Sequence, residues 1–298
     1  MNVKSKVAAV LIAVAVAGAV PAVAGAGAAP DPNAVIEAAV ERVTGAERVR
    51  AWTTATADLA DEADDRTTLT DRRGRSIGAA LVGASPAAGR AGDGRTVFRD
   101  ALPATDAGVE RTGSGLRLTT VLKDGRAPEE FRFALSLPEG SAPLPRANGS
   151  VDVVDPAGRV VASINKPWAF DATGAAVPTR YRVEGSVLVQ RVEHGGAAYP
   201  VVADPSIDFG LTSATITLNP KDQRIILSGG GVAAGGLLGA LICSGSGPGA
   251  ALCAIGGAVI GEIVFEAIKE YAVKDNCDLE VTIGYVPPRV TNVEQVCH

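Results

Sequence analysis

The chain has 298 residues, a length that supports one or two domains with hydrophobic cores. Its 33 acidic and 28 basic side chains give a formal net charge of -5, and the basic residues form no cluster. Such a chain lacks the positive patch of nucleic-acid-binding proteins and is repelled by anionic polymers and lipids, so we expect no nucleic-acid partner.

The first 24 residues have the three parts of a secretory signal peptide. Lys4 and Lys6 give the positive start, and an Ala-rich apolar run spans residues 7–20. The Ala-Val-Ala sequence at 22–24 offers a cleavage site, and Ala-Gly-Ala at 26–28 offers a second. A retained membrane anchor is the alternative, but glycine and proline interrupt a run that is shorter than the roughly 20 apolar residues of a spanning helix. We therefore expect a signal peptide at residues 1–24 and a protein that is secreted to the extracellular space.

Two segments precede the main β pattern. In residues 25–50, Pro32 follows Asp31 and a one-sided apolar stripe continues to Val43, which predicts a short amphipathic helix. Residues 51–95 are rich in Ala, Gly, Asp, Arg and Thr and hold few large apolar side chains. A segment of this composition buries too little surface to offset the entropy of ordering it, so we expect a flexible linker there.

Residues 96–207 change to the period of two that marks half-buried strands. Phe131, Phe133 and Leu135 alternate with polar or small residues, and turn sequences such as Asp-Pro-Ala-Gly at 155–158 separate the apolar runs. Many short strands with tight turns predict an antiparallel β-sandwich-like module. The expected strands are at residues 116–122, 131–137, 151–154, 159–164, 177–183, 187–192 and 199–202.

Four motifs occur in order within this module. They are APEEFRF at 127–133, PWAFDA at 167–172, VPTRY at 177–181 and YPVVADP at 199–205. With them, residues 100–206 resemble a β module of actinobacterial secreted proteins of unknown function, which ends in a Tyr-Pro-Val...Asp-Pro signature. A similar module lies upstream of the repeats in some RHS-type secreted proteins, but no such repeats follow here. The resemblance implies export and a β fold, and it assigns no catalytic residue.

Residues 208–298 have a different composition. Two apolar runs rich in Gly and Ala, at 225–243 and 250–271, flank a Gly/Ser-rich turn at 244–249, which predicts a helical hairpin. A β-like tail with alternating Leu279, Val281, Ile283 and Tyr285 follows. The expected fold class is therefore α+β: an antiparallel β-sandwich-like module followed by a Gly/Ala-rich α-helical hairpin with a disulfide-tied tail.

All four cysteines, Cys243, Cys253, Cys277 and Cys297, lie in this last segment. An even number in an exported protein predicts two disulfides. Zinc is the competing interpretation, but their spacings of ten, twenty-four and twenty positions contain no Cys-x-x-Cys pair. A Cys243–Cys253 bond would pin the helical hairpin and a Cys277–Cys297 bond would close the tail, although four cysteines allow three connectivities and the sequence does not choose among them.

Glycines at four-residue spacing line one face of each expected helix. Gly231, Gly235 and Gly239 lie on the first, and Gly257 and Gly261 lie on the second, so the helices can approach closely, as helices do in membranes. Membrane insertion through residues 225–271 is therefore possible. Against it stands an acidic stripe on the second helix at positions 262, 266 and 270, because one carboxylate near the bilayer centre costs roughly 2.5 to 3.5 kcal/mol.

The sequence offers little catalytic chemistry. Ser76 lies in a G-x-S-x-G pattern like that of a hydrolase nucleophile, but the preceding residues are polar and charged rather than an apolar strand. His194, in a Glu-His-Gly-Gly turn, is expected to be exposed, and the other histidine is the last residue. We expect no catalytic residue, no cofactor and no metal site.

These observations favour a secreted non-enzymatic protein. The β module would be a scaffold that presents residues 208–298 as an interaction domain for an extracellular or cell-surface protein. The alternative is a membrane-perturbing secreted effector that acts through the Gly-rich hairpin.

Overall fold

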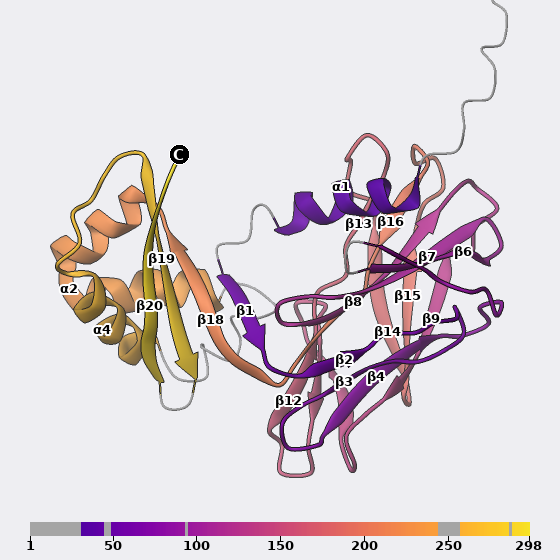
Figure 1. Ribbon diagram of the computed structural model, residues 1–298, viewed down its shortest axis with the longest axis horizontal. Coiled ribbons are helices and arrows are strands. Elements are labelled where there is room, and N and C mark those ends of the chain that lie inside the picture. Colours follow the sequence, from indigo (N-terminus) through magenta and orange to yellow (C-terminus); the bar gives the residue numbers. More distant parts are fainter. Residues whose placement is uncertain (1–30, 45–48, 93–94, 244–256, 286–287) are drawn as a thin grey trace, which may run out of the picture. The chain divides into compact units, whose positions relative to one another are not determined.

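The computed structural model describes residues 31–44, 49–92, 95–243, 257–285 and 288–298 (Figure 1). The expected signal peptide and the turn at 244–249 lie outside the described residues. The described chain forms mostly antiparallel β sheets with three helices, which confirms the α+β class at this level.

The largest sheet has ten strands. Its main path runs β10-β11-β12-β17-β8-β7-β6-β5, and β16 pairs with both β8 and β13. The bounds along this path are β10 Ala142–Pro145, β11 Val151–Val154, β12 Val160–Ile164, β17 Ser206–Phe209, β8 Gly115–Leu122, β7 Thr105–Arg111, β6 Arg95–Leu102 and β5 Arg90–Gly92, with β13 Ala169–Phe170 and β16 Val201–Ala203 beside it.

A second sheet has six strands in the order β14-β15-β9-β4-β3-β2. Their bounds are β14 Thr179–Glu184, β15 Val187–Val192, β9 Glu130–Ser136, β4 Ser76–Leu81, β3 Thr67–Thr70 and β2 Thr56–Asp58. From here on, β module means these two sheets together with helix α1, Pro32–Thr44, and so extends beyond the expected residues 96–207.

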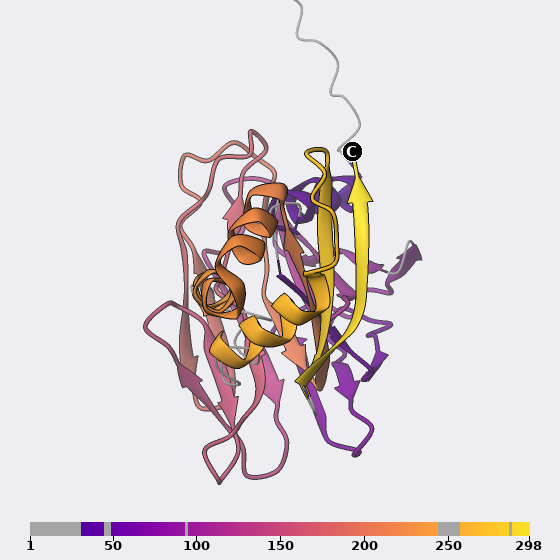
Figure 2. The ribbon, with the colours of Figure 1, turned by 90° about the vertical axis from the view of Figure 1, so that its left-hand side faces the viewer.

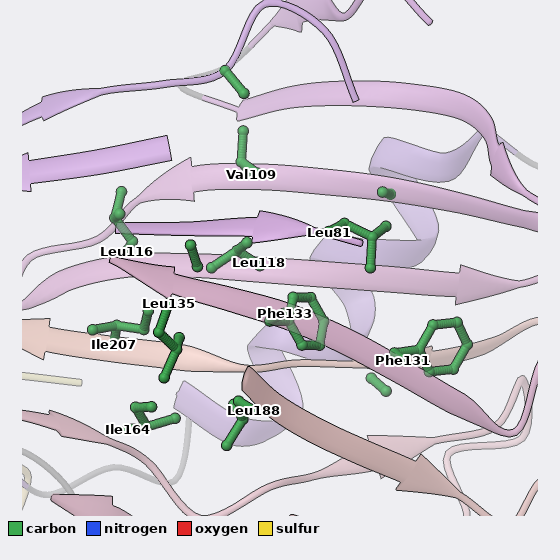
Figure 3. Close-up of a cluster of buried hydrophobic side chains, with 14 of the residues drawn as sticks. Leu81, Val109, Leu116, Leu118, Phe131, Phe133, Leu135, Ile164, Leu188 and Ile207 are labelled. Carbon is green, nitrogen blue, oxygen red and sulfur yellow. The ribbon is translucent and has the colours of Figure 1, made fainter. Parts of the chain in front are cut away.

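One hydrophobic cluster contains side chains from both sheets of the β module (Figure 3). Phe131 and Phe133 of β9 are buried and alternate with the partly exposed Arg132, because successive side chains of a strand point to opposite faces. Leu116 of β8 and Ile207 of β17 belong to the same cluster and are fully buried. The period of two that predicts the strands also selects the side chains that fill this core.

Helix α1, Pro32–Thr44, packs against strands β8 and β16. Ile36 forms a small cluster with Val121 and Val202 of those strands. Gly108 of β7 lies below the helix, and a Cβ on it would come within 3.1 Å of the Ile36 Cδ1 atom. The expected amphipathic helix is therefore present, and it covers apolar residues of the ten-stranded sheet.

The third sheet has four strands in the order β1-β18-β19-β20. Helices α2 and α4 lie on one face of it (Figure 2), and their apolar side chains form a core with the strands. We refer to this sheet with its helices as the C-terminal unit. Its elements are β1 Val49–Thr53, β18 Leu211–Leu218, α2 Pro220–Cys243, α4 Gly257–Ile268, β19 Cys277–Tyr285 and β20 Pro288–Cys297.

The start of α2 shows why the helix begins there. The backbone N–H of Asp222 donates to the side chain of Asn219 at 2.9 Å, and the N–H of Asn219 donates to the Asp222 carboxylate at 3.1 Å. This reciprocal pair satisfies two of the N–H groups that a helix start leaves unpaired. Pro220 occupies the first helical position, where its missing N–H costs nothing.

Residues 51–95 are not a flexible linker, which corrects the expectation from composition. Most of β1 and all of β2, β3, β4 and β5 lie in this range. Small residues such as Ala55, Ala60 and Ala63 are buried in the core of the β module. These small residues can form part of a core because larger side chains on distant strands fill the remaining space. A segment with few large apolar residues is therefore still buried.

Candidate interaction surface

Helices α2 and α4 meet at glycines. A Cβ atom on Gly261 would lie 2.2 Å from the backbone N of Gly235 and 2.6 Å from the carbonyl O of Gly231. These distances leave no room for a side chain, so the two backbones are in direct contact at this point. The small-residue face that the spacing predicts is therefore used, except that Gly239 has no atom within 4 Å of a Cβ and lies outside the contact.

Glu262 of α4 fills the space that Gly231 leaves open. Its Oε2 atom would lie 1.8 Å from a Cβ on Gly231, while the residue as a whole remains exposed. One turn further, Glu266 accepts a hydrogen bond from Lys269 at 2.6 Å. The pKa of Lys269 is raised by this contact first, and also by the nearby charges of Glu270 and Glu262. The stripe thus forms a local negative field.

A groove lies between α4 and the beginning of β20, with a volume of about 470 Å³. Ile263 and Ala267 of α4 and Val290 of β20 supply apolar atoms; all three are half-buried, and Ala267 and Val290 pack against the core of the C-terminal unit. The remaining lining residues are Glu262, Glu266, Pro288 and Arg289. The groove therefore combines an apolar floor with a charged rim that is acidic on the helix side.

The opposite face of the four-stranded sheet is polar. The indole N–H of Trp52 donates to the Thr215 hydroxyl at 2.9 Å, and that hydroxyl lies 2.9 Å from the hydroxyl of Thr282. Arg50 pairs with Glu280 at 2.5 Å. Trp52 nevertheless remains 43% exposed, so its ring is an apolar patch on a polar face.

Two of the four cysteines form a disulfide among the described side chains. Cys277 and Cys297 are opposite each other in the pairing of β19 with β20, and their sulfur atoms are 2.06 Å apart. The bond ties the start of β19 to the end of β20. The expected partners Cys243 and Cys253 lie outside the described side chains, so that bond stays a prediction.

A buried acid lies in the β module, between β16 and β17. One oxygen of Asp204, Oδ1, accepts hydrogen bonds from the backbone N–H of Trp168 at 3.0 Å and from the hydroxyl of Tyr181 at 3.4 Å. The Ser206 hydroxyl donates to the other oxygen at 3.4 Å. Burial raises the pKa of Asp204 to about 7, although these bonds and the charge of Arg117 oppose the shift. The carboxyl group is thus held largely neutral in acidic solution.

His194 is buried rather than exposed, contrary to expectation. Its exposed fraction is 3%, and its Nδ1 atom lies 2.7 Å from the hydroxyl of Tyr199. The same hydroxyl donates to the His194 carbonyl at 3.2 Å. The glycines that follow it indicated a turn correctly, but not that the turn folds its side chain inward.

Ser76 lies within β4, where its hydroxyl is 2.8 Å from that of Thr70. Strand β4 pairs with β3 and β9, so Ser76 lies in a paired β-strand. The nucleophile of a hydrolase with the G-x-S-x-G pattern lies instead at a sharp turn between a strand and a helix.

The described residues contain no group of three or more His, Cys, Asp or Glu side chains arranged for a metal ion. Within the same residues, no helix is both long enough and apolar enough to cross a membrane.

Sequence reasoning missed parts of this surface. Trp52 and Arg50 belong to β1, which lay in or beside the expected linker, although their alternation with Ala51 and Thr53 carried a weak strand signal. Arg289 and Val290 meet α4 only through the tertiary fold.

Comparisons of the chain with protein-family models, with curated proteins and with solved structures find no match.

Proposed function

We propose that the chain is a secreted, non-enzymatic protein in which the β module is a scaffold and the C-terminal unit binds an extracellular or cell-surface protein. The proposal includes two finer features of the fold. The two large sheets form a β-sandwich-like scaffold, and α2 and α4 form a helical hairpin around residues 244–249.

The groove between α4 and β20 is the observation that carries this proposal. It belongs to a unit with its own hydrophobic core, whose residues are distinct from the core of the β module. A surface on such a unit can vary without repacking the scaffold. Exposed apolar atoms with a polar rim are typical of sites that bind other molecules.

Two sequence features support export. Residues 1–24 have the form of a signal peptide, and residues 100–206 resemble the β module of actinobacterial secreted proteins. The whole chain, expressed in a secreting bacterial host, is expected in the medium with Gly25 as its first residue. Mass spectrometry of the secreted protein measures this. Recovery of the uncut chain in the membrane fraction would contradict export.

A membrane-perturbing effector is the second candidate. It is favoured by exposed apolar side chains on both helices, because Val232 of α2 is 90% exposed and Val259 of α4 is 51% exposed. Isolated exposed valines are common on soluble proteins, however, and the acidic stripe of α4 opposes insertion.

A dye-release assay separates the two candidates. The oxidised full chain is mixed with liposomes that hold a trapped dye between pH 5 and 8, with Val232→Glu as a matched variant that disfavours insertion. The interaction proposal expects no release from either protein. If the native chain releases the dye and Val232→Glu does not, the interaction proposal is overturned and the membrane-perturbing candidate is favoured.

A further inference from the structure

We infer that Asn148 is a site of spontaneous modification, at which the side-chain amide cyclises onto the backbone nitrogen of Gly149 and is hydrolysed to aspartate and isoaspartate. Ser150 promotes this reaction. The inference is independent of the proposed function, because it concerns a reaction of the chain with itself and with water.

Asn148 and Gly149 lie in the tight turn between β10 and β11. The backbone N–H of Arg146 donates to the carbonyl of Ser150 at 2.9 Å, and the N–H of Gly149 donates to the carbonyl of Arg146 at 3.0 Å. Gly149 has a φ of 91°, a conformation that favours glycine. Asn148 and Gly149 are both exposed. Since glycine has no side chain, its backbone nitrogen is open to attack the amide that precedes it.

Ser150 activates the side-chain amide of Asn148. Its backbone N–H donates to the Oδ1 atom of Asn148 at 3.0 Å, and its hydroxyl donates to the same atom at 2.8 Å. A donor N–H requires an oxygen as its partner, which fixes the orientation of the amide. Nucleophilic attack on the Cγ atom places negative charge on Oδ1, so the two donors stabilise the charge that develops in the transition state.

The reaction needs only the chain and water. The Gly149 nitrogen forms a bond with the Cγ atom of Asn148, the bond between Cγ and Nδ2 breaks, and the proton of the Gly149 N–H reaches Nδ2 through water, so that ammonia leaves. Water then opens the cyclic imide. Opening at Cγ gives aspartate, and opening at the backbone carbonyl of Asn148 gives isoaspartate, in which the main chain runs through the side chain. Each product carries a negative charge that asparagine lacks.

Strand β10 allows the turn to open, which the attack requires because the Gly149 N–H is bound to Arg146. It is the terminal strand of the ten-stranded sheet and pairs with β11. Two of its four residues, Pro143 and Pro145, have no N–H to donate. Local separation of such an edge strand costs less free energy than unfolding of the whole β module, so the reactive conformation is accessible in the folded protein.

Another exposed asparagine provides an internal control. The pair at 148–149 is the only Asn-Gly sequence in the chain. Asn292 is also exposed, but it precedes Val293, whose branched side chain hinders attack by the backbone nitrogen between them. Exposure alone therefore predicts similar modification of the two asparagines, whereas the chemistry of the turn predicts modification of Asn148.

Peptide mapping of the oxidised full chain tests the inference. The chain is incubated at pH 5 and at pH 8, mass spectrometry measures the conversion of amide to acid at each asparagine, and an isoaspartate methyltransferase detects the isoaspartyl product. Conversion at Asn148 is expected to exceed conversion at Asn292 and to be faster at pH 8, because the attacking nitrogen must lose its proton. Equal conversion at the two positions, or no conversion at Asn148, would overturn the inference.

Matched variants test the part played by Ser150. Ser150→Ala removes the hydroxyl donor and keeps the backbone N–H, so it is expected to slow conversion at Asn148 about fivefold, the factor that corresponds to one hydrogen bond. Ser186→Ala makes the same change in another exposed turn, and its expected rate is that of the native chain. If Ser150→Ala reacts as fast as the native chain, Ser150 does not promote the reaction and the inference fails. Circular dichroism checks that each variant is folded, and the comparison of Asn148 with Asn292 decides the outcome if Ser150→Ala is not.

Discussion

The β module and the C-terminal unit differ in how their elements meet. In the β module, large side chains such as Phe131 and Phe133 fill the space between strands of two sheets. In the C-terminal unit, the helices come together where side chains are absent, at Gly231, Gly235 and Gly261. Both interiors are filled by apolar side chains, and the C-terminal unit adds a direct backbone contact between its two helices.

Each region also buries an acidic side chain. The β module holds Asp204 in a fully buried position, where hydrogen bonds from Trp168 and Tyr181 compensate part of the cost. In the C-terminal unit the buried acid Asp222 lies at the start of α2, where its carboxylate accepts the N–H of Asn219, while Glu262 stays on the surface.

The two tryptophans allow the regions to be followed separately. Trp52 belongs to the four-stranded sheet of the C-terminal unit, and Trp168 lies beside Phe170 and Asp204 in the β module. Trp168→Phe leaves a reporter for the C-terminal unit, and Trp52→Phe leaves a reporter for the β module. Fluorescence-detected denaturation of these two backgrounds gives one unfolding curve for each region.

The largest expected effect is that Asp204→Asn raises the free energy of unfolding of the β module at neutral and alkaline pH. The pKa of Asp204 is raised from an ordinary 3.8 to about 7, so the folded protein keeps a proton that the unfolded chain releases between these values. The protonated carboxyl of Asp204 therefore contributes its full stabilisation below pH 4. This contribution is lost as the pH rises through 7, which lowers the free energy of unfolding by on the order of 4 kcal/mol. Asn keeps an acceptor for Trp168 and stays neutral, so it removes this loss. Denaturation of the Trp52→Phe background at pH 4 and pH 8 measures it.

An aspartate that is only partly buried, Asp155, provides the control. The pKa of Asp155 is lowered, first by a backbone hydrogen bond from Arg159, so its ionised form stabilises the fold. Asp155→Asn is therefore expected to change stability in the opposite direction, as a small loss at pH 8 that disappears at low pH. If Asp204→Asn behaves like Asp155→Asn, Asp204 is not a destabilised buried acid.

The next effect concerns the disulfide of the C-terminal unit. Cys277→Ala with Cys297→Ala opens a loop of 20 residues, and its expected cost is about 3 kcal/mol. Alanines are preferable to a reductant because reduction would also act on any bond between the other cysteines. The loss is expected in the Trp168→Phe background, and an equal loss in the Trp52→Phe background would show that the two regions unfold together.

The strands of the β module could be predicted because their signal is local. At β9 and β11 the alternation of side chains marks both the element and its buried face, whereas consecutive side chains are buried in β8, β15 and β16. The range 51–95 could not be predicted, because the large side chains that its described residues bury in the core are few, Leu69, Ile77 and Leu81, and the rest of its packing comes from distant strands. Composition measures what a segment contributes to a core, and it does not measure what other segments bring.

In the C-terminal unit, too, some features could be predicted from the sequence and others could not. The glycine spacing predicted the α2–α4 contact, and the alternation at Leu279, Val281 and Ile283 predicted β19. The partnership of β1 with β18 was not predictable, since it joins residues more than 150 positions apart through backbone hydrogen bonds that carry no residue preference. The groove shares this origin, because it exists only once β20 lies beside α4.

The smallest expected effect tests the backbone contact itself, with a pair of substitutions that are identical in chemistry. Gly261→Ala places a methyl group 2.2 Å from the Gly235 nitrogen and is expected to cost about 2 kcal/mol, because the helices must separate to admit it. Gly236→Ala, with no atom within 4 Å, is expected to gain about 0.5 to 1 kcal/mol, since alanine favours a helix interior. Opposite signs in the Trp168→Phe background would establish that this unit depends on missing side chains. Gains from both would mean that the helices do not touch at Gly261, and the contrast between the two interiors would then be lost.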